Sequence, residues 1–549
     1  MIKYDFDPKT QDIFNKYYLH EGGTNWEKWL KISNKDEYLD LCLKNSGLDS
    51  VDDIFDKIRT AKTNSKQLSV DLESFLAGYD QNFPPILCHT SGTTNNNPQA
   101  LKWFNMSKSI INKLWIPGME AIFESSGLNS SSSAVIFVPS RMKFDGINEF
   151  NGEKYLSLYS SEFSQRLVIS QLKPKSYVLY PYKDVYNLEV LSSVLSLENI
   201  TIISAPAATI LKWADFNRLK SGIQQYLSNL KKNKNYRKSE NKLSKKITIK
   251  GLDNAVREIQ KDLSKKFSKS VAIFSISSLN REKWNMIRDF MHWTRGNERF
   301  TNLYVGSEIG PFASSLPRDN FQISKENKMY VLPLTLPALE YRDKIKPIYE
   351  FESNKGRLLI SRNHDYRPLL NIDTGDVISL LGHNSLPIIR GDILRGEFKL
   401  KYNVKINNTI ESPPNPIIKA GNFFTFDNFV IYNSQLLYNC INKHCSLDGD
   451  SMVLVESLKE SPQWKFIIPT SEVKCVSKNK IENIIYNCPD EPELKDNLRN
   501  GNISIKLFDK NVIGFLEPRS KVLEKVRKGL YPKGILKKWP LYVIKKEVN

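Results

Sequence analysis

The fold is decided by a short apolar run, Ala134-Val135-Ile136-Phe137-Val138, and by four later runs of the same kind. They are Ser176-Tyr-Val-Leu-Tyr180, Ile200-Thr-Ile-Ile203, Val271-Ala-Ile-Phe274 and Thr301-Asn-Leu-Tyr-Val305. Runs of this length, rich in β-branched and aromatic residues, are typical of buried strands. Longer segments with helical periodicity separate them. This alternation predicts an α/β fold with largely parallel strand pairing.

The flanking sequence predicts further parts of the chain. Residues 10–80 repeat apolar side chains near the helical period, which indicates a helical N-terminal segment. Between residues 330 and 400 the strand runs lie closer together, as in a small β-rich subdomain, and the pattern changes again near 392–396. We therefore expect a large N-terminal body of α/β layers with a β-rich subdomain, followed by a smaller, mobile α+β C-terminal domain. The expected boundaries are 1–82, 83–391 and 392–549.

Composition excludes several classes of protein. The chain has 549 residues, of which 40% are apolar, so it is too apolar to be disordered and too long for one ordinary core. It has no run of eighteen apolar residues, so a membrane span is not expected. The first 24 residues lack the apolar block of a signal peptide. Only six cysteines are present, which indicates a reducing, cytoplasmic setting.

Four of these cysteines lie late in the chain. Cys440 and Cys445 are followed by Cys475 and Cys488, and His444 adjoins the second of them. Four thiolates suit zinc, but the spacing matches no standard zinc knuckle. Buried free thiols are therefore the expected reading, with a zinc site as the alternative.

The net charge of +19 is strongly basic, and part of it is concentrated in one stretch. Residues Lys231 to Lys250 include nine Lys or Arg and one Glu. We expect a solvated loop there, with a docking patch for an anionic partner as the alternative. Tyr236 is the only aromatic residue in this stretch, which disfavours binding of single-stranded nucleic acid.

The strongest local signal is Thr90-Ser91-Gly92-Thr93-Thr94, which directly follows the apolar run Ile86-Leu87-Cys88. Hydroxyls around a glycine form a loop whose backbone N–H groups and side chains can hold phosphate oxygens. The sequence is not the GxxxxGK[ST] loop, and a plain surface loop is the alternative. His89 lies between the two, where a packing or capping role is expected rather than a catalytic one.

Residues Thr90 to Thr94 resemble the phosphate loop of adenylate-forming enzymes, which include acyl- and aryl-CoA ligases, luciferases and peptide-synthetase adenylation domains. The family pattern continues as Gly-x-Pro-Lys. This chain has Asn95 in place of the glycine and Gln99 in place of the lysine, with Lys102 three residues later. The resemblance implies that Thr90, Ser91, Gly92, Thr93 and Thr94 bind the nucleotide.

Three later motifs resemble the same family and follow in the expected order. Tyr304-Val305-Gly306-Ser307-Glu308 is similar to its Tyr-Gly-x-Thr-Glu segment, which implies that Tyr304 stacks on adenine. Ser307 would then reach the α-phosphate and Glu308 would hold Mg²⁺. Asp373-Thr374-Gly375-Asp376 resembles the family's Thr-Gly-Asp signature, which implies that Asp376 accepts hydrogen bonds from the ribose hydroxyls. A turn Asp between two strands is the alternative for that position.

Arg390-Gly391-Asp392 resembles the family's hinge, which implies that Arg390 meets ribose or phosphate and that Asp392 is the point of rotation. The last motif, Pro532-Lys533-Gly534-Ile535-Leu536-Lys537-Lys538, resembles the late segment that carries the family's catalytic lysine. Lys533 and Lys537 are both candidates, with a solvated basic tail as the alternative. A cation there would stabilise charge on the transferring phosphoryl group.

The resemblance implies ATP- and Mg²⁺-dependent conversion of a carboxylic acid into an acyl-adenylate, with Glu308, Thr94 and a late lysine as catalytic residues. Coenzyme A is the expected acceptor, with an amine or an acyl-carrier protein as alternatives. The motifs are nearest the phenylacetate–CoA ligase or acyl-protein synthetase branches. Two other classes stay open: a non-catalytic nucleotide-binding relative, and a basic nucleic-acid-binding protein, which the composition disfavours.

Overall fold

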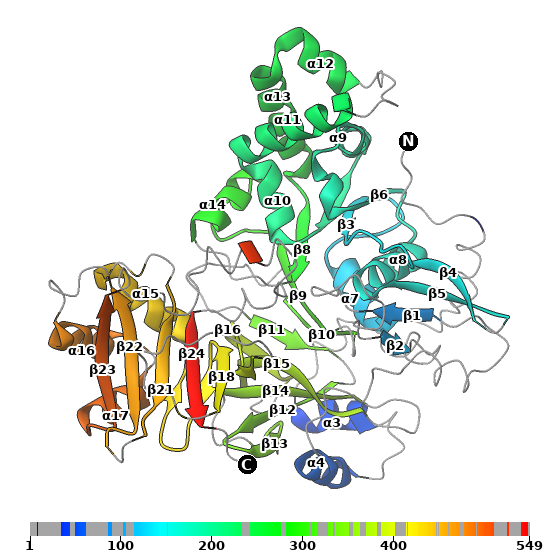
Figure 1. Ribbon diagram of the computed structural model, residues 1–549. Helices are drawn as coiled ribbons and strands as arrows, with labels where there is room; N and C mark the ends of the chain where they lie inside the picture. Colours follow the sequence, from blue (N-terminus) through cyan, green and yellow to red (C-terminus); the bar gives the residue numbers. More distant parts are fainter. Residues whose placement is uncertain are drawn as a thin grey trace.

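The structure, a computed structural model, arranges the chain around one long sheet with a second, six-stranded sheet beside it (Figure 1). It describes residues 8, 34–43, 50–61, 86–89, 103–105, 115–150, 152–232, 242–275, 281–306, 310–315, 328–332, 335–350, 355–362, 369–381, 386–400, 413, 415–445, 447, 450–458, 461–470, 477–489, 491–509, 524–525 and 540–546.

The long sheet has twelve strands in the order β13-β12-β14-β15-β16-β11-β10-β9-β8-β7-β3-β6. Five neighbouring strands are parallel: β3 (Ser133–Val138), β6 (Ser176–Pro181), β7 (Ile200–Ser204), β8 (Val271–Ser275) and β9 (Phe300–Gly306). The others are antiparallel: β10 (Gly310–Ser314), β11 (Lys328–Val331), β12 (Thr335–Tyr341), β13 (Lys344–Pro347), β14 (Lys355–Arg362), β15 (Leu369–Leu381) and β16 (Ile388–Arg395). The parallel strands contain the five apolar runs, so the predicted α/β class and parallel pairing are confirmed.

Helices cover both faces of the parallel strands because successive side chains of a strand point to opposite faces. In β3, Ala134, Ile136 and Val138 belong to one apolar core, while Val135 and Phe137 belong to another. The first core includes α7 (Ile116–Ser125) and α8 (Ser160–Leu172). The second includes α9 (Leu188–Ser196), α10 (Ala207–Ala214), α11 (Phe216–Lys232), α12 (Lys242–Lys250), α13 (Leu252–Phe267) and α14 (Arg281–Phe290), with the short 3₁₀ helix η3 (Tyr182–Tyr186).

The basic stretch differs from its prediction. Residues 242–250 form α12, not a loop, and residues 231–232 end α11. Leu243 of α12 is buried in the second core, and Lys246 pairs with both Glu258 and Asp262 of α13. One apolar anchor and these ion pairs hold the helix against α13, which a count of charges along the sequence does not reveal.

Two N-terminal helices, α3 (Lys35–Leu43) and α4 (Val51–Thr60), pack on the antiparallel part of the long sheet (Figure 1). The side chain of Ser50 accepts a hydrogen bond from Asp53 N and so caps the start of α4. At its other end, Asn371 Nδ2 of β15 donates to the carbonyls of Ile58 (2.6 Å) and Ala61 (3.0 Å). These helices are therefore part of the core that supports β12, β14 and β15.

A four-stranded sheet lies beside α8. Its order is β2-β1-β5-β4, with β1 and β5 parallel. The strands are β1 (Ile86–His89), β2 (Trp103–Asn105), β4 (Gly146–Phe150) and β5 (Glu153–Tyr159). The predicted apolar run before the hydroxyl loop is thus a buried strand, and it ends at His89.

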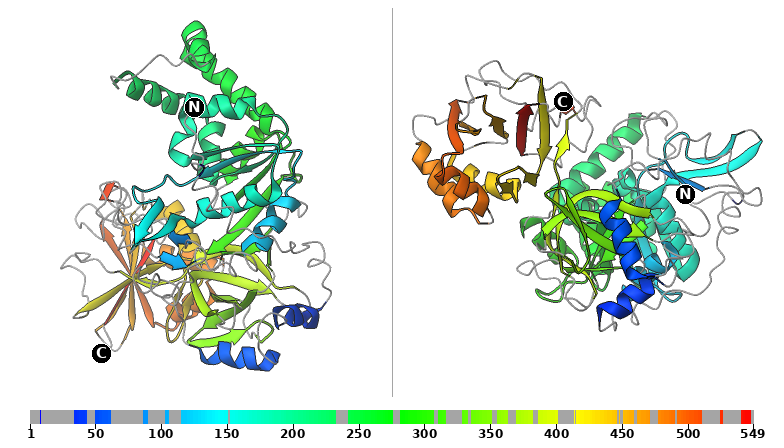
Figure 2. Two further views of the ribbon diagram at one scale, coloured as in Figure 1. Left: turned by 90° about the vertical axis from the view of Figure 1, so that its right-hand side faces the viewer. Right: turned by 90° about the horizontal axis from the view of Figure 1, so that it is seen from below.

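The C-terminal part contains the six-stranded sheet β17-β18-β24-β21-β22-β23 with a core of its own (Figure 2). Its strands are β17 (Phe398–Lys399), β18 (Pro416–Gly421), β21 (Met452–Glu456), β22 (Trp464–Thr470), β23 (Ile503–Asp509) and β24 (Leu541–Lys546). The hairpin β19 (Phe424–Thr425) and β20 (Val430–Ile431) and the helices α15 (Ser434–Cys445), α16 (Lys478–Asn487) and α17 (Pro492–Arg499) complete it. None of the helices that the structure describes could cross a membrane by its length and apolar content.

The chain passes from the long sheet to the C-terminal sheet at residues 396–397, between β16 and β17. The carbonyl of Arg395 accepts hydrogen bonds from Asn422 N (2.8 Å) and Phe423 N (3.2 Å). The two backbones approach closely, since a Cβ on Gly421 would lie 2.9 Å from the carbonyl oxygen of Gly396. On the far side of the junction, Arg342 Nη2 donates to Glu493 Oε2 at 3.0 Å.

Candidate functional site

The order of the parallel strands defines where a ligand is expected. From β3 the chain runs outward to β6 and then returns to β7 on the other side of β3. In open α/β sheets, ligands bind at the carboxyl ends of the strands next to such a switch point. Residues 139–145 follow β3 at this edge, residues 205–206 follow β7, and β9 ends there at Gly306.

Two residues from separate predicted motifs meet near this edge. Tyr304, two residues before the end of β9, donates its Oη proton to Asp376 Oδ2 of β15 at 2.5 Å. The two residues are 72 positions apart in the sequence. Asp376 is only 2% exposed, so its buried carboxylate is stabilised by hydrogen-bond donors of the protein, such as Tyr304, instead of by water.

The contact exists because the long sheet curls back on itself. Four strand spacings separate β9 from β15, which would be about 19 Å on a flat sheet. A second contact across four spacings is the hydrogen bond from Arg362 of β14 to the carbonyl of Pro311 in β10. Pairing irregularities at Pro311/Ala313 and at Val377/Ser379 are places where such a sheet bends.

The segment around Asp376 is held rigidly. Gly375 has a φ of +71°, a backbone conformation that glycine adopts without strain. Asp373 Oδ1 accepts from Gly375 N at 2.7 Å, and Thr374 Oγ1 donates to the carbonyl of Leu358 at 2.9 Å. The motif therefore lies inside the long strand β15, and the alternative of a turn between two strands is wrong.

A second cation fixes Asp376. Arg395 lies directly opposite Asp376 in the β15–β16 pairing, and its guanidinium forms an ion pair with Asp376 Oδ1. Sequence reasoning did not single out Arg395, because the pairing irregularity between Val377 and Ser379 hides the register. The predicted Arg390 lies opposite Ser379 instead. Asp392 also lies within β16, four residues before the chain leaves the long sheet.

Electrostatics keep the Tyr304 phenol protonated. Burial raises the pKa of Tyr304 well above its ordinary value, and the negative charge of Asp376 raises it further. The phenol is therefore a permanent donor to an ionised carboxylate. The ring also packs on Phe312, with 4.3 Å between the ring centroids. This arrangement gives Tyr304 the role of aligning Asp376, in addition to the stacking role that its motif implied.

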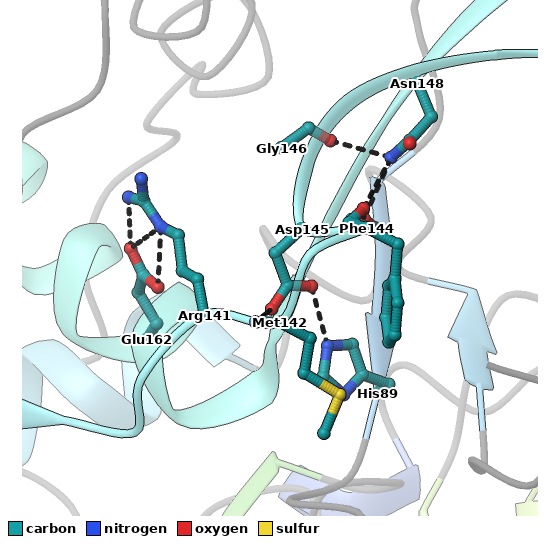
Figure 3. Close-up of polar contacts among 9 residues, drawn as sticks. His89, Arg141, Met142, Phe144, Asp145, Gly146, Asn148 and Glu162 are labelled. Carbon is teal, nitrogen blue, oxygen red and sulfur yellow. Dashed lines mark hydrogen bonds and ion pairs between the residues drawn. The ribbon is translucent and has the colours of Figure 1, made fainter. Parts of the chain in front are cut away.

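A second polar cluster joins the end of β1 to the segment after β3 (Figure 3). His89 is fully buried, and its Nε2 lies 2.8 Å from Asp145 Oδ1. Asp145 Oδ2 accepts from Met142 N at 2.7 Å, which closes the turn 142–145. The imidazole packs against the rings of Trp103, Phe144 and Tyr159. His89 thus joins two segments at the sheet edge, which fits the packing role expected of it.

The same segment holds an ion-pair network. Arg141 donates through Nε (3.1 Å) and Nη2 (2.5 Å) to Glu162, which lies in the first turn of α8 and is fully buried. Arg166 Nε donates to the same carboxylate at 2.8 Å. Two guanidinium groups thus flank the one buried carboxylate of Glu162. Gln165 Oε1 is buried nearby on α8 with no hydrogen-bond partner among the described residues.

Glu308, the residue predicted to hold Mg²⁺, lies outside the described residues. Among them, no group of three His, Cys, Asp or Glu side chains is placed to bind a metal ion. Both oxygens of Asp376 already bind Tyr304 and Arg395. Mg²⁺ is commonly held by substrate phosphates and one or two carboxylates, so here it would enter with the nucleotide.

The zinc alternative finds no support in the described cysteines. The Sγ atoms of Cys440 and Cys488 lie 2.9 Å apart, Cys445 is buried, and all three are free thiols. Burial raises the pKa of Cys488, which keeps it a thiol instead of a thiolate ligand.

Nine predicted site residues lie outside the described residues. They are Thr90, Ser91, Gly92, Thr93, Thr94, Ser307, Glu308, Lys533 and Lys537. Their described neighbours in the sequence are His89, at the end of β1, and Gly306, at the end of β9. Their roles stay predictions.

No model of a known protein family and no curated protein matches the chain. Solved structures do. An open conformation of 2-hydroxyisobutyryl-CoA ligase, in complex with 2-HIB-AMP and CoA, is 9% identical with a TM-score of 0.49. That match covers 93% of this chain and 90% of the ligase.

Two further solved structures match less closely. The adenylation domain of a keto acid-selecting NRPS module, bound to a keto acyl adenylate, is 9% identical with a TM-score of 0.36, covering 81% of this chain and 68% of that one. ATP-bound MatB from Rhodopseudomonas palustris is 8% identical with a TM-score of 0.37, covering 78% and 66%. The structures to which the chain is similar are thus adenylate-forming enzymes, the class that its motifs resemble.

Proposed function

We propose that this chain uses ATP to convert a carboxylic acid into an acyl-adenylate, with release of pyrophosphate. The observation that carries the proposal is the hydrogen bond between Tyr304 and Asp376. The two residues belong to different motifs, each of which implied contact with adenosine, and they meet near the edge of the sheet where ligands bind.

The geometry suits a ribose. An ionised carboxylate has about four lone-pair positions, of which Tyr304 and Arg395 take one on each oxygen. Tyr304 and Arg395 hold the carboxylate in one orientation, and the two neighbouring hydroxyls of a ribose are the donors that we propose for it. Because the carboxylate is already aligned, binding costs little reorganisation.

The reaction follows from this anchor. A carboxylate oxygen of the acid attacks the α-phosphorus of ATP, a new P–O bond forms, and the bond to pyrophosphate breaks. In the proposal, Thr93 and Thr94 hold phosphate oxygens, Glu308 holds Mg²⁺, and Lys533 or Lys537 offsets the charge that develops on the α-phosphate. Coenzyme A, an amine or a carrier-protein thiol then attacks the acyl carbon and AMP leaves.

Arg395 would link the two half-reactions. Its side chain binds Asp376, while its carbonyl binds the backbone N–H groups of Asn422 and Phe423 in the C-terminal part. A nucleotide at Asp376 therefore acts on a residue that is itself the junction between the sheets. Rotation of the C-terminal domain about residues 392–397 is the motion we propose between the two steps.

One observation favours a second candidate, a non-catalytic relative that binds nucleotide. Gln99 stands where the family's phosphate loop carries a lysine, which removes a positive charge from the predicted phosphate site. Such a protein would bind ATP through the Asp376 anchor and release no pyrophosphate.

The test is pyrophosphate release with MgATP and hydroxylamine trapping, across aryl, short-chain, long-chain and amino acids. We expect release with one class of acid, and its loss in Glu308→Gln and Asp376→Ala. Asp253→Ala, in the first turn of α13 outside the site, is the control and should keep full activity. If no acid causes pyrophosphate release but ATP still binds, the non-catalytic relative is favoured. If ATP does not bind either, the family assignment is rejected.

A further inference from the structure

Most of the net positive charge of this chain comes from residues 216–232 and 242–269. They contain thirteen Lys or Arg and three Asp or Glu, a net charge of +10 out of +19 for the whole chain. The helices α11, α12 and α13 of these residues are together called the basic projection. In Figures 1 and 2 they extend away from the C-terminal sheet, beyond the parallel strands.

The acidic side chains described in the basic projection form ion pairs with lysines of the same projection. Asp253 pairs with Lys220 at 2.8 Å. Glu258 pairs with Lys246 (2.9 Å) and Lys250 (2.6 Å), and Asp262 pairs with Lys246. Several exposed lysines have no acidic partner among the described residues: Lys242, Lys245, Lys261, Lys265 and Lys269. The lysines outnumber the acidic side chains on this surface, so it carries a net positive charge.

The surface also presents an apolar side chain. Ile249 is 81% exposed, the most exposed large hydrophobic residue among those described. Positions three and seven apart share one face of a helix, so Ile249 lies on the same face of α12 as Lys242 and Lys245. A short apolar tip among lysines is the pattern of helices that lie on anionic membranes, with the charges at the headgroups and the apolar side chain below them.

Nucleic acid fits this surface less well. Binding of single strands uses aromatic rings on which bases stack. The described aromatic residues of the projection are used inside the protein: Phe267 is buried, Phe216 lies under Arg257, and Tyr226 bonds Asn187. An exposed isoleucine also buries no apolar surface against a hydrated phosphate backbone, so it does not strengthen binding to nucleic acid.

We propose that the basic projection is a docking surface for a membrane that contains anionic phospholipid. The lysines on α12 and α13 attract the headgroups, and Ile249 enters the interface. Each lysine in contact with such a surface strengthens binding about fivefold. This proposal does not depend on the adenylation activity, because the projection lies outside the Tyr304–Asp376 site.

The test is sedimentation of the full chain with vesicles of phosphatidylcholine alone, or of phosphatidylcholine mixed with phosphatidylserine. We expect binding to the mixed vesicles only, weakened by added salt because salt screens exposed charges. The double variant Lys242→Gln with Lys245→Gln should bind about 25-fold less tightly. Ile249→Ser should bind about tenfold less tightly, by a factor that salt changes little.

The matched control is Lys478→Gln with Lys480→Gln on α16, which removes the same charge elsewhere. All of these changes are at exposed positions, so unchanged thermal unfolding will show that each variant is folded. The proposal is overturned if the mixed vesicles do not bind, or if the α16 variant loses as much as the α12 variant. It is also overturned if duplex DNA binds in place of vesicles and the α12 variant abolishes that binding.

Discussion

Replacing Tyr304 by Phe isolates one hydrogen bond of the proposed nucleotide site. The change removes the Oη that donates to Asp376 and keeps the ring that packs on Phe312. Asp376 keeps its ion pair with Arg395, so the carboxylate stays buried and charged with one donor fewer. The structure around it has no reason to repack.

A hydrogen bond to a charged group contributes about 1.5–3 kcal/mol. The free energy of unfolding should therefore fall by about 2 kcal/mol, which lowers Tm by roughly 3 °C in a body of about 300 residues. If alignment of Asp376 is needed for ribose binding, the same energy weakens ATP binding about 30-fold.

Tyr180→Phe is the matched control. Tyr180 is also a buried tyrosine of the long sheet, but its Oη reaches only the neutral hydroxyl of Ser193, at 3.3 Å. Its loss should cost about 0.5 kcal/mol and leave ATP affinity unchanged. Urea unfolding and calorimetric titration with ATP measure both effects. The reasoning is refuted if Tyr304→Phe binds ATP as tightly as the wild type, or if both variants lose stability equally.

Three further predictions concern other parts of the molecule. Asn371→Ala removes both hydrogen bonds to the end of α4 and places alanine at a φ of +50°. The free energy of unfolding in urea should therefore fall by about 2–3 kcal/mol. A fall below about 0.5 kcal/mol would contradict the docking role of α4. Burial and the charge of Asp145 raise the pKa of Tyr159 to about 12. The unfolded state then loses this proton first, so stability should fall between about pH 10 and pH 12, and Tyr159→Phe should fall less over that range. Arg342 has a φ of +50° and pairs with Glu493. Arg342→Gly and Arg342→Ala both lose this ion pair, but only the alanine keeps the backbone strain, so urea unfolding should show the glycine variant to be about 1 kcal/mol more stable. Equal stability of the two variants would show that the turn is unstrained.

The sequence predicted the parallel half of the long sheet because each of its strands is a compact apolar run. In β3, alternate residues belong to two different cores, so every position from Ala134 to Val138 is apolar and the run is easily recognised. The class of fold followed from this alone. The predicted loop at 242–250 was wrong because one buried leucine and two lysine-mediated contacts stabilise α12, and neither is visible in composition.

Two residues of the candidate site were named from the sequence, but the geometry that joins them was not. Tyr304 and Asp376 were found from motifs, yet their contact depends on the curl of a sheet in which four strand spacings separate them. The contact of Arg395 with Asp376 depends on the register of β15 and β16, which an irregularity in their pairing shifts. His89 and Asp145, 56 residues apart, meet because β5 lies between β1 and β4, the strands that they adjoin, in the four-stranded sheet. Long-range pairing of this kind leaves no periodic trace in a single sequence.

Acid-dependent exchange of labelled pyrophosphate into ATP is the most direct test of adenylate formation, because it needs no acceptor. We expect exchange with one class of carboxylic acid, none without acid, and none in Asp376→Ala. Failure of every acid to support exchange, with a wild type that does not bind ATP, would contradict the proposed function. Exchange that persists unchanged in Asp376→Ala would contradict the site assigned here.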